Sequence, residues 1–336
     1  MPAPRFARDR ALAFAPASVG NIGVGFDLLG HALAGPGDWV EVRRTAEPGV
    51  VLAPIEGADR PLPQRAEDNT AGAALLSFHT ALGCPGGFEA RIRKGIPFGS
   101  GMGGSAASAV AAVVAANALL EEPLPREALY RHALDGEAVA SGSRHGDNVA
   151  PILLGGVALA VGERPPLRLP VPPELHCAHV HPHCAIETRK ARAALAGAYR
   201  LDAFVRQSGH LALLLLGLTR GDRELIAAGL DDGLIEPRRA GLIPGFAEVK
   251  RAALDHGALG ASISGAGPSV FAWCWGRADA ERVARAMQAA FRGAGLDSDR
   301  LVCPVDAPGA RVHVPGTDLE PPRPAHCESE SLPCAS

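Results

Sequence analysis

Residues 97–120 read PFGSGMGGSAASAVAAVVAANALL, a glycine-rich loop that runs directly into an alanine-rich segment of helical composition. The loop glycines are Gly99, Gly101, Gly103 and Gly104. Backbone N–H groups in the first turn of a helix have no partner inside the helix, and the helix dipole adds about half a positive charge there. Glycine has no Cβ, so an anion can approach this backbone closely. The stretch therefore predicts a phosphate-binding loop at the start of a helix.

Three kinds of phosphate site, and one structural alternative, fit such a loop. A P-loop needs GxxxxGK[ST], but the nearest lysines are Lys94, before the loop, and Lys190, far beyond it. Residues 99–104 match the dinucleotide fingerprint GxGxxG, which follows a buried parallel strand. Residues 89–94 instead alternate between polar and apolar, as half-exposed strands do. The third kind is a lysine-free loop in which backbone amides and a metal ion neutralise the phosphates, and the structural alternative is a glycine turn before a buried helix.

The composition favours one large or two ordinary globular domains, with 336 residues, 47% hydrophobic residues and a formal net charge of −3. This charge gives no reason to expect nucleic acid or a membrane surface as a partner. Apolar runs such as residues 211–216 are too short to span a bilayer, which needs about 20 residues. The seven cysteines form no CxxC pair, and residues 1–10 lack the pattern of a signal peptide. We therefore expect a cytoplasmic protein with reduced thiols.

Periodicity and turn residues predict a mixed succession of strands and helices. Strands are expected at residues 14–18 (stopped by Pro16), 39–43, 88–93, 152–161, 175–181, on both sides of a glycine turn in 260–275, and at 301–305. Helices are expected at 70–82 (capped by Asp68 or Asn69), 105–120, 125–142, 188–195, 201–218, 222–230, 247–256, and after a cap at Asp279. The proline-rich residues 162–173 indicate a domain boundary, which gives domains at 1–165 and 166–310 and a disordered tail at 311–336.

Two further polar segments are candidate parts of a site. Residues 18–30 form a glycine-rich loop with one Asn and one Asp, which is typical of a binding loop or of an ordinary turn. Residues 143–148 (SRHGDN) follow a helix that carries Glu137. Because Mg²⁺ prefers hydroxyl, carboxylate and phosphate oxygens, Ser105 and Glu137 are the candidate metal ligands. The alternative for Glu137 is a solvated helix residue.

Three separated segments resemble the motifs of the GHMP small-molecule kinases, and the resemblance extends to about residue 305. The segments are residues 16–30 (PASVGNIGVGFDLLG, the first motif), 97–108 (the lysine-free ATP loop) and 260–271 (GASISGAGPSVF, the third motif). Further features are similar to the branch of this family that phosphorylates homoserine: the form NxGxGFDxLG of the first motif, HGDN at 145–148 with Pro151, and Glu236-Pro237 followed by LIPGF at 242–246.

The resemblance implies an α+β fold of two domains, a ribosomal-S5-like N-terminal domain and a ferredoxin-like C-terminal domain, with ATP and a small alcohol meeting between them. It implies that Ser105 and Glu137 hold Mg²⁺. It also implies that the loop binds ATP through Pro97, Phe98, Gly99, Ser100, Gly101, Met102, Gly103, Gly104, Ser105, Ala106 and Ala107. The family usually has serine at the position of Gly104, so this chain lacks a hydroxyl group there.

By the same resemblance the substrate is homoserine, whose hydroxyl group receives the γ-phosphoryl group of ATP in threonine biosynthesis. Arg192 and Arg239 fit the substrate carboxylate because guanidinium groups bind carboxylates bidentately, and Arg238 is the rival of Arg239. Asp27 fits the ammonium group. The remaining substrate-binding candidates are Asn21, His145, Asn148 and Thr188, and the catalytic candidates are Glu137, Asn148, His145 and Asn21. Asp147 is an alternative general base, although a loose transition state can proceed without one.

Other interpretations stay open at this point. A GHMP kinase for another small alcohol would keep the ATP loop but not the arginine pair, a dinucleotide-binding dehydrogenase would bind NAD, and a non-catalytic sensor would not need Ser105 and Glu137. Residues 176–184 (HCAHVHPHC) place three histidines on one strand face, which is the spacing of a zinc trio, but Pro182 interrupts the strand. We interpret these histidines as incidental. A homodimer is common among relatives.

Overall fold

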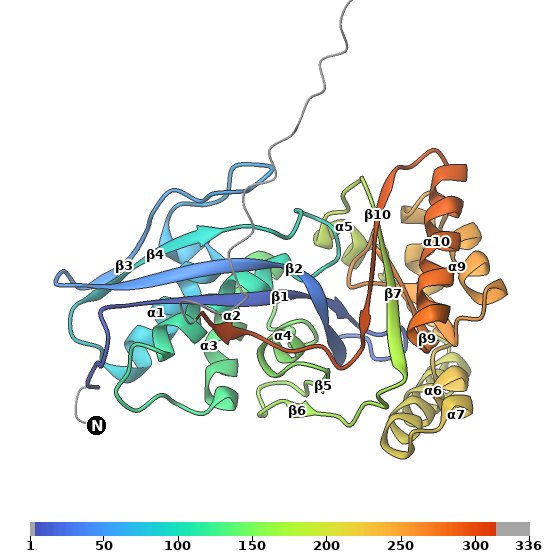
Figure 1. Cartoon of the computed structure of the whole chain (residues 1–336), viewed down its shortest axis with the longest axis horizontal. Helices are drawn as coiled ribbons and strands as arrows, with labels where there is room; N and C mark the ends of the chain where they lie inside the picture. The colour runs from blue at the N-terminus through green and yellow to red at the C-terminus, as the bar shows by residue number, and fades with distance from the viewer. Residues whose placement is uncertain (1–3, 314–336) are drawn as a thin grey trace, which may run out of the picture.

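The computed structural model describes residues 4–313, and its larger sheet is built mainly from the N-terminal half of the chain (Figure 1). The sheet has seven strands: five follow the order β11-β1-β2-β4-β3, while β5 pairs with β2 and β6 pairs with β5. Their bounds are β1 Arg10–Gly20, β2 Leu29–Thr45, β3 Gly49–Leu52, β4 Gly87–Arg93, β5 Val157–Leu159, β6 Leu167–Arg168 and β11 Arg311–Val312. Burial alternates along β4, as its sequence predicts.

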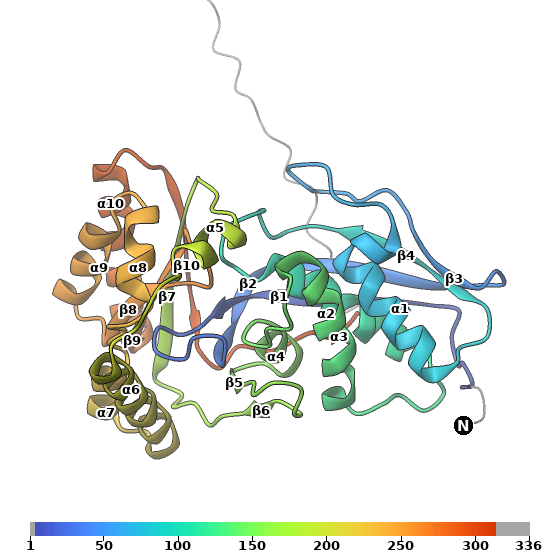
Figure 2. The same cartoon turned by 180° about the vertical axis from the view of Figure 1, so that it is seen from behind.

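Three helices pack together against one face of this sheet (Figure 2): α1 Thr70–Leu82, α2 Gly104–Asn117 and α3 Arg126–Ser141. A 3-10 turn, Ala66–Asp68, leads to Asn69, whose side-chain oxygen accepts the N–H groups of Ala71 and Gly72 and caps α1. Residues 106–117 of α2 are all buried, because small side chains let neighbouring helices and strands approach on every side. The core therefore fixes the N-terminus of α2 in place.

The second sheet is antiparallel, with the order β10-β7-β9-β8. Its strands are β7 Leu175–Pro182, β8 Gly260–Ile263, β9 Val270–Trp275 and β10 Ser298–Pro304. The helices α9 Phe246–Asp255 and α10 Arg277–Gly293 cover one face (Figure 1), and α6 Leu201–Arg220 packs on α7 Arg223–Gly229. Short helices, α5 Thr188–Ala193, α8 Glu236–Arg239 and the 3-10 turn Ala240–Leu242, complete this part. The expected α+β class is confirmed.

The expectation that the apolar run at residues 152–161 forms one strand is wrong, because the run begins inside a helix and contains only a short strand. Residues Val149–Leu154 form the helix α4, and only Val157–Leu159 form a strand, β5. Five of the six residues of α4 are buried. A run of apolar residues that is buried on all sides carries no period, so the sequence cannot distinguish a helix from a strand there.

Two expected element ends are also wrong. Pro16 does not stop the first strand, because β1 continues to Gly20 through a register shift against β2 between Pro16 and Ser18. The helix α10 begins at Arg277, with Gly276 at its cap, so Asp279 lies in the first turn and pairs with Arg282 instead. Val283, Met287 and Phe291 form a buried stripe along this helix.

The chain crosses between the two sheets at points that differ from the expected boundaries. β6 pairs with β5 just after residue 165, and Arg311–Val312 return to pair with β1. The expectation of a disordered tail from residue 311 is therefore wrong for these two residues, which add an edge strand to the first sheet. Residues 314–336 of that expected tail lie outside the described residues. Within residues 4–313 no helix has the length and apolar character that a membrane crossing requires.

Candidate active site

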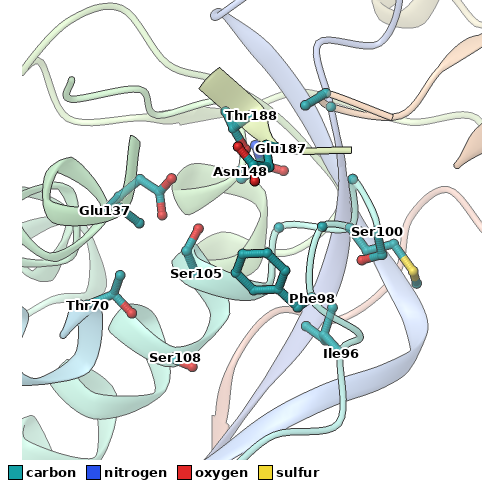
Figure 3. A pocket seen from close by; sticks show the side chains of 18 of the residues that line it. Thr70, Ile96, Phe98, Ser100, Ser105, Ser108, Glu137, Asn148, Glu187 and Thr188 are labelled. Carbon is teal, nitrogen blue, oxygen red and sulfur yellow. The ribbon is translucent and has the colours of Figure 1, made fainter. Parts of the chain in front are cut away.

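A cavity of about 520 Å³ brings together segments from both halves of the chain (Figure 3). Its wall contains most of the residues that the sequence singled out: Asn21, Asp27, Pro97, Phe98, Gly99, Ser100, Gly101, Met102, Gly103, Gly104, Ser105, Glu137, His145, Asn148, Thr188, Arg192 and Arg239. Ala106 and Ala107 are the exceptions, because their side chains are fully buried in the core behind α2. The three motif segments thus meet at one site.

The glycine loop is anchored through its carbonyl groups. Four consecutive carbonyl oxygens accept hydrogen bonds from outside the loop: Gly99 from Ile186 N (3.0 Å), Ser100 from Ser269 Oγ (2.7 Å), Gly101 from Ser264 Oγ (2.8 Å) and Met102 from Ser18 N (3.1 Å). No described residue accepts a hydrogen bond from the N–H groups of residues 100–106. Because these donors also start α2, they form an anion site of the predicted kind.

Gly103 shows why a side chain is excluded from the loop. Its φ is +70°, and a Cβ would lie 2.3 Å from Ser18 Oγ and 2.9 Å from Asn148 Oδ1. At the neighbouring Gly104, the position where this chain departs from the resembled motif, a Cβ would meet Ile96 Cγ2 at 3.2 Å. The glycine loop therefore lies directly against the first motif and against Asn148.

A lysine lies at the base of the loop, which the sequence reasoning missed. Lys94 Nζ forms an ion pair with the fully buried Asp38 and donates to Gly104 O at 2.8 Å and to Ser108 Oγ at 2.9 Å. Asp38 Oδ1 also accepts the N–H groups of residues 95 and 96. The charge of Lys94 is thus paired inside the protein and orients the start of α2. The only sequence signal was its position at the end of the strand that leads to the loop.

Ser105 and Glu137 form the predicted hydroxyl–carboxylate pair. Their side chains point toward one another from α2 and α3 (Figure 3). Burial raises the pKa of Glu137 to about 7, although the nearby hydroxyl group of Ser105 opposes this shift. A cation beside this carboxylate would favour its charged form. The two oxygen-bearing groups therefore fit a magnesium ion, which prefers such hard ligands.

Asp27 and Arg192 are joined by a bidentate ion pair. Arg192 Nη1 donates to Asp27 Oδ2 at 2.9 Å, and Nη2 donates to Oδ1 at 3.0 Å. His145 Nδ1 lies 3.4 Å from Asp27 Oδ2, and burial lowers the pKa of His145 while Asp27 raises it. A carboxylate and a guanidinium group with opposite charges are thus exposed to the same cavity.

Asn21 and Asn148 make their hydrogen bonds within the protein. Asn21, at a φ of +72°, donates from Nδ2 to Gly265 O at 2.8 Å, and its Oδ1 accepts the N–H of Asp27 at 3.0 Å. Asn148 Oδ1 accepts from Ser18 Oγ at 2.8 Å, and its Nδ2 donates to Asp147 Oδ2 at 3.2 Å. These bonds fix the shape of the cavity floor around the reacting groups.

Asp147 is a buried carboxyl group in the cavity wall. Burial raises its pKa to about 7, and the charge of Asp27 adds to this shift. The carboxyl group is therefore close to half protonated at neutral pH.

The two neighbouring arginines at 238 and 239 point to different places. Arg239 is buried and donates to Gly265 O at 3.0 Å and to Ala191 O at 3.2 Å, in the cavity wall. Arg238 donates to the carbonyl groups of residues 195, 196 and 198 and lies over the ring of Tyr199. Of the two residues that the sequence left open, the geometry favours Arg239.

The histidines of residues 176–184 have other partners. His181 Nδ1 lies 3.0 Å from Ser269 Oγ, the hydroxyl group that anchors the glycine loop, and His183 pairs with Asp299 at the edge of β10. In the described part of the chain, no three His, Cys, Asp or Glu side chains are grouped so that they could hold a metal ion. His181 therefore supports the loop.

Two family models match this chain. The model for the GHMP kinases N terminal domain covers residues 69–156, and the model for GHMP kinases C terminal covers residues 214–293. A protein of Xanthomonas campestris pv. campestris (strain B100) named homoserine kinase is 60% identical over 312 residues, which are 93% of this chain and 96% of that protein. A homoserine kinase of Chloroherpeton thalassium is 45% identical and covers 89% of this chain and 98% of its own length.

Solved structures agree with these relatives. The crystal structure of homoserine kinase from Cytophaga hutchinsonii is 42% identical, with a TM-score of 0.87 over 91% of this chain and 98% of that chain. A mevalonate kinase from L. major, in complex with R-mevalonate, has a TM-score of 0.66 at 15% identity over 90% of this chain and 99% of its own, which indicates a shared fold alone.

Proposed function

The chain belongs to the GHMP kinase family, and from this membership we propose that it is an ATP-dependent kinase that phosphorylates L-homoserine. The products are O-phospho-L-homoserine and ADP, in threonine biosynthesis. The observation that carries the proposal is one cavity that holds the unpartnered N–H groups of the glycine loop beside the charged groups of Asp27, Arg192 and Arg239. The N–H groups suit the phosphates of a nucleotide, and the charged side chains suit the ammonium and carboxylate groups of an amino acid.

The terminal phosphates of ATP bind the N–H groups of residues 100–106. The dipole of α2 adds positive potential at the N-terminus of this helix. The hydrogen bonds to the loop carbonyl groups hold the loop in one conformation, so its N–H groups need not reorganise when the phosphates bind. The charge of Lys94 is already paired with Asp38, so the loop depends on its amides and on a divalent cation.

Ser105 and Glu137 are the proposed magnesium ligands. Bound there, Mg²⁺ would neutralise phosphate charge that develops during transfer. Glu137→Gln keeps the size and shape of the side chain, and burial disfavours the charged form of Glu137, so the fold should survive. We expect turnover to fall by roughly 10²-fold or more, as for the loss of other groups that stabilise transition-state charge. Near-normal turnover in a variant with an unchanged melting temperature would refute the metal assignment.

The substrate binds by its three polar groups. Its carboxylate binds Arg192 and Arg239, and its ammonium group binds Asp27, which now pairs with Arg192. Thr188 is the first residue of α5 and lines the same cavity. The hydroxyl group then points toward His145, Asn148 and Asn21, in line with the γ-phosphorus. Because a loose transition state needs positioning and charge neutralisation above all, these contacts can carry most of the catalysis, and Asp147 is the alternative general base.

A coupled assay of ADP release tests the proposal directly. L-Homoserine should support turnover, and mevalonate, galactose and shikimate should not. Turnover with one of these controls instead would indicate a GHMP kinase for another alcohol, whereas binding of NAD without ADP release would favour a dehydrogenase. Binding without any turnover would favour a sensor.

We also propose a cytoplasmic location and a homodimer. The absence of CxxC pairs among the seven cysteines supports the location. Light scattering after gel filtration tests the dimer, since a mass near 34.6 kDa would contradict it.

A further inference from the structure

One aromatic ring in the cavity wall contacts both of the arginines that face it. The guanidinium carbon of Arg192 lies 5.2 Å from the centroid of the Phe26 ring, and that of Arg239 lies 5.1 Å from the same centroid. Arg192 belongs to α5 and Arg239 to α8, while Phe26 belongs to the loop between β1 and β2. The ring is half-buried and lines the cavity.

The two cations have different hydrogen-bond partners, although the charges of Asp27 and Asp147 act on both. Arg239 is held by two carbonyl oxygens, Gly265 O and Ala191 O, which carry no full charge. Arg192 is held by Asp27. Like charges so close together repel each other, and both burial and Arg192 lower the pKa of Arg239. The electron-rich face of a ring attracts cations within about 6 Å of its centroid, so Phe26 offsets part of this repulsion.

Substrate binding would increase the importance of the ring. Under the proposed function, the ammonium group of the substrate binds Asp27, so Arg192 shares its ion-pair partner with the ligand. Both guanidinium groups also face the ring of Phe26, and because this contact uses no hydrogen-bonding group, the polar groups of the ligand do not compete for it. Its backbone is fixed as well, because the next residue, Asp27, has a φ of +57° and donates its N–H to Asn21.

We propose that Phe26 is a positioning residue that holds Arg192 and Arg239 on one ring, at the spacing that lets both bind a single substrate carboxylate. The inference rests on the proposed function and extends it, since it assigns preference for an α-carboxylate to a side chain that does not touch the reacting atoms. A cation–π contact changes an equilibrium constant by about 2- to 30-fold.

The test compares Phe26→Leu with Phe26→Tyr in steady-state ADP release. Leucine keeps an apolar side chain of similar bulk without a ring, whereas tyrosine keeps the ring face. We expect Phe26→Leu to raise the KM for L-homoserine by about 10-fold, with kcat within about 3-fold of wild type, because the arginines act on binding. Phe26→Tyr should restore most of the lost affinity. As a competitor of homoserine, 3-aminopropan-1-ol lacks the carboxylate, so its inhibition constant should change by less than about 2-fold in either variant.

Three results would overturn the inference. They are an unchanged KM in Phe26→Leu, an equal rise of KM in Phe26→Leu and Phe26→Tyr, and a parallel rise in the inhibition constant of 3-aminopropan-1-ol, which would indicate a loosened pocket. Melting temperatures of both variants show whether they are folded. Wild-type enzyme without homoserine turnover would instead refute the proposed function itself, so the two failures are distinguishable.

Discussion

Gly103→Ala is the substitution whose effect the structure determines most directly. The new Cβ would lie 2.3 Å from Ser18 Oγ, far inside van der Waals contact. Ser18 is fully buried in β1 and donates a hydrogen bond to Asn148 Oδ1 at 2.8 Å. Because this hydroxyl group is buried and already bonded to Asn148, the methyl group should break this bond and displace both Asn148 and the glycine loop.

The magnitude follows from a matched control, Gly83→Ala. Gly83 caps α1 with a φ of +60°, close to the +70° of Gly103, but a Cβ there meets nothing within 4 Å. The left-handed backbone costs an alanine about 1–2 kcal/mol at either position. Gly103→Ala also leaves buried polar groups without their bond, which costs about 1–3 kcal/mol. We therefore expect a loss of about 1–2 kcal/mol in the control and about 2–5 kcal/mol in Gly103→Ala.

Urea denaturation gives these unfolding free energies, and ADP release is measured at a temperature where both variants are folded. Gly83→Ala should keep its kcat, because Gly83 lies at the far end of α1. Gly103→Ala should lose about 100-fold in kcat, the usual effect of moving catalytic groups by about 1 Å. Equal stability losses in the two variants, together with normal turnover of Gly103→Ala, would refute the reasoning from the Ser18–Asn148 contact.

Two further predictions concern charged groups. Arg239→Lys should raise the KM for homoserine by about 10- to 100-fold, because it loses charge-assisted hydrogen bonds of about 1.5–3 kcal/mol. In the control variant Arg238→Lys, the KM should stay within about 3-fold of the wild-type value. Equal effects on KM would contradict the assignment of Arg239. Burial lowers the pKa of His31 from 6.5 to about 4, so its neutral form stabilises the fold above pH 6.5 and this contribution is lost as the pH falls toward 4. Urea denaturation at pH 7.5 and pH 5 should show that the wild type loses about 2 kcal/mol more than His31→Leu, and equal losses would contradict this role.

The sequence predicted the elements whose signals are local. The helix α1 has its expected bounds because Asn69 caps it and Gly83 ends it. The glycine loop leads into α2 as expected, because unpartnered amides and small side chains depend only on the immediate backbone. The run at 152–161 was misread since a segment buried on all sides shows no period.

In the site, the residue types could be predicted but not their partners. Motif positions identified Asp27, Arg192, Ser105 and Glu137, and the cavity brings these residues together. Whether Arg238 or Arg239 faces the ligand depends on the direction of each side chain on a four-residue helix, which no local pattern encodes.

The amino-acid sequence by itself therefore determined where a phosphate loop starts a helix, because that signal lies within a few consecutive residues. Only the tertiary structure decided that Lys94 pairs with Asp38 across 56 positions of chain and that Phe26 lies between two arginines from different helices. The reason is physical: backbone conformation responds to neighbours in sequence, whereas charge pairing and ring contacts depend on distances in space that are set when strands pair, as β2 and β4 do, and when the two sheets pack.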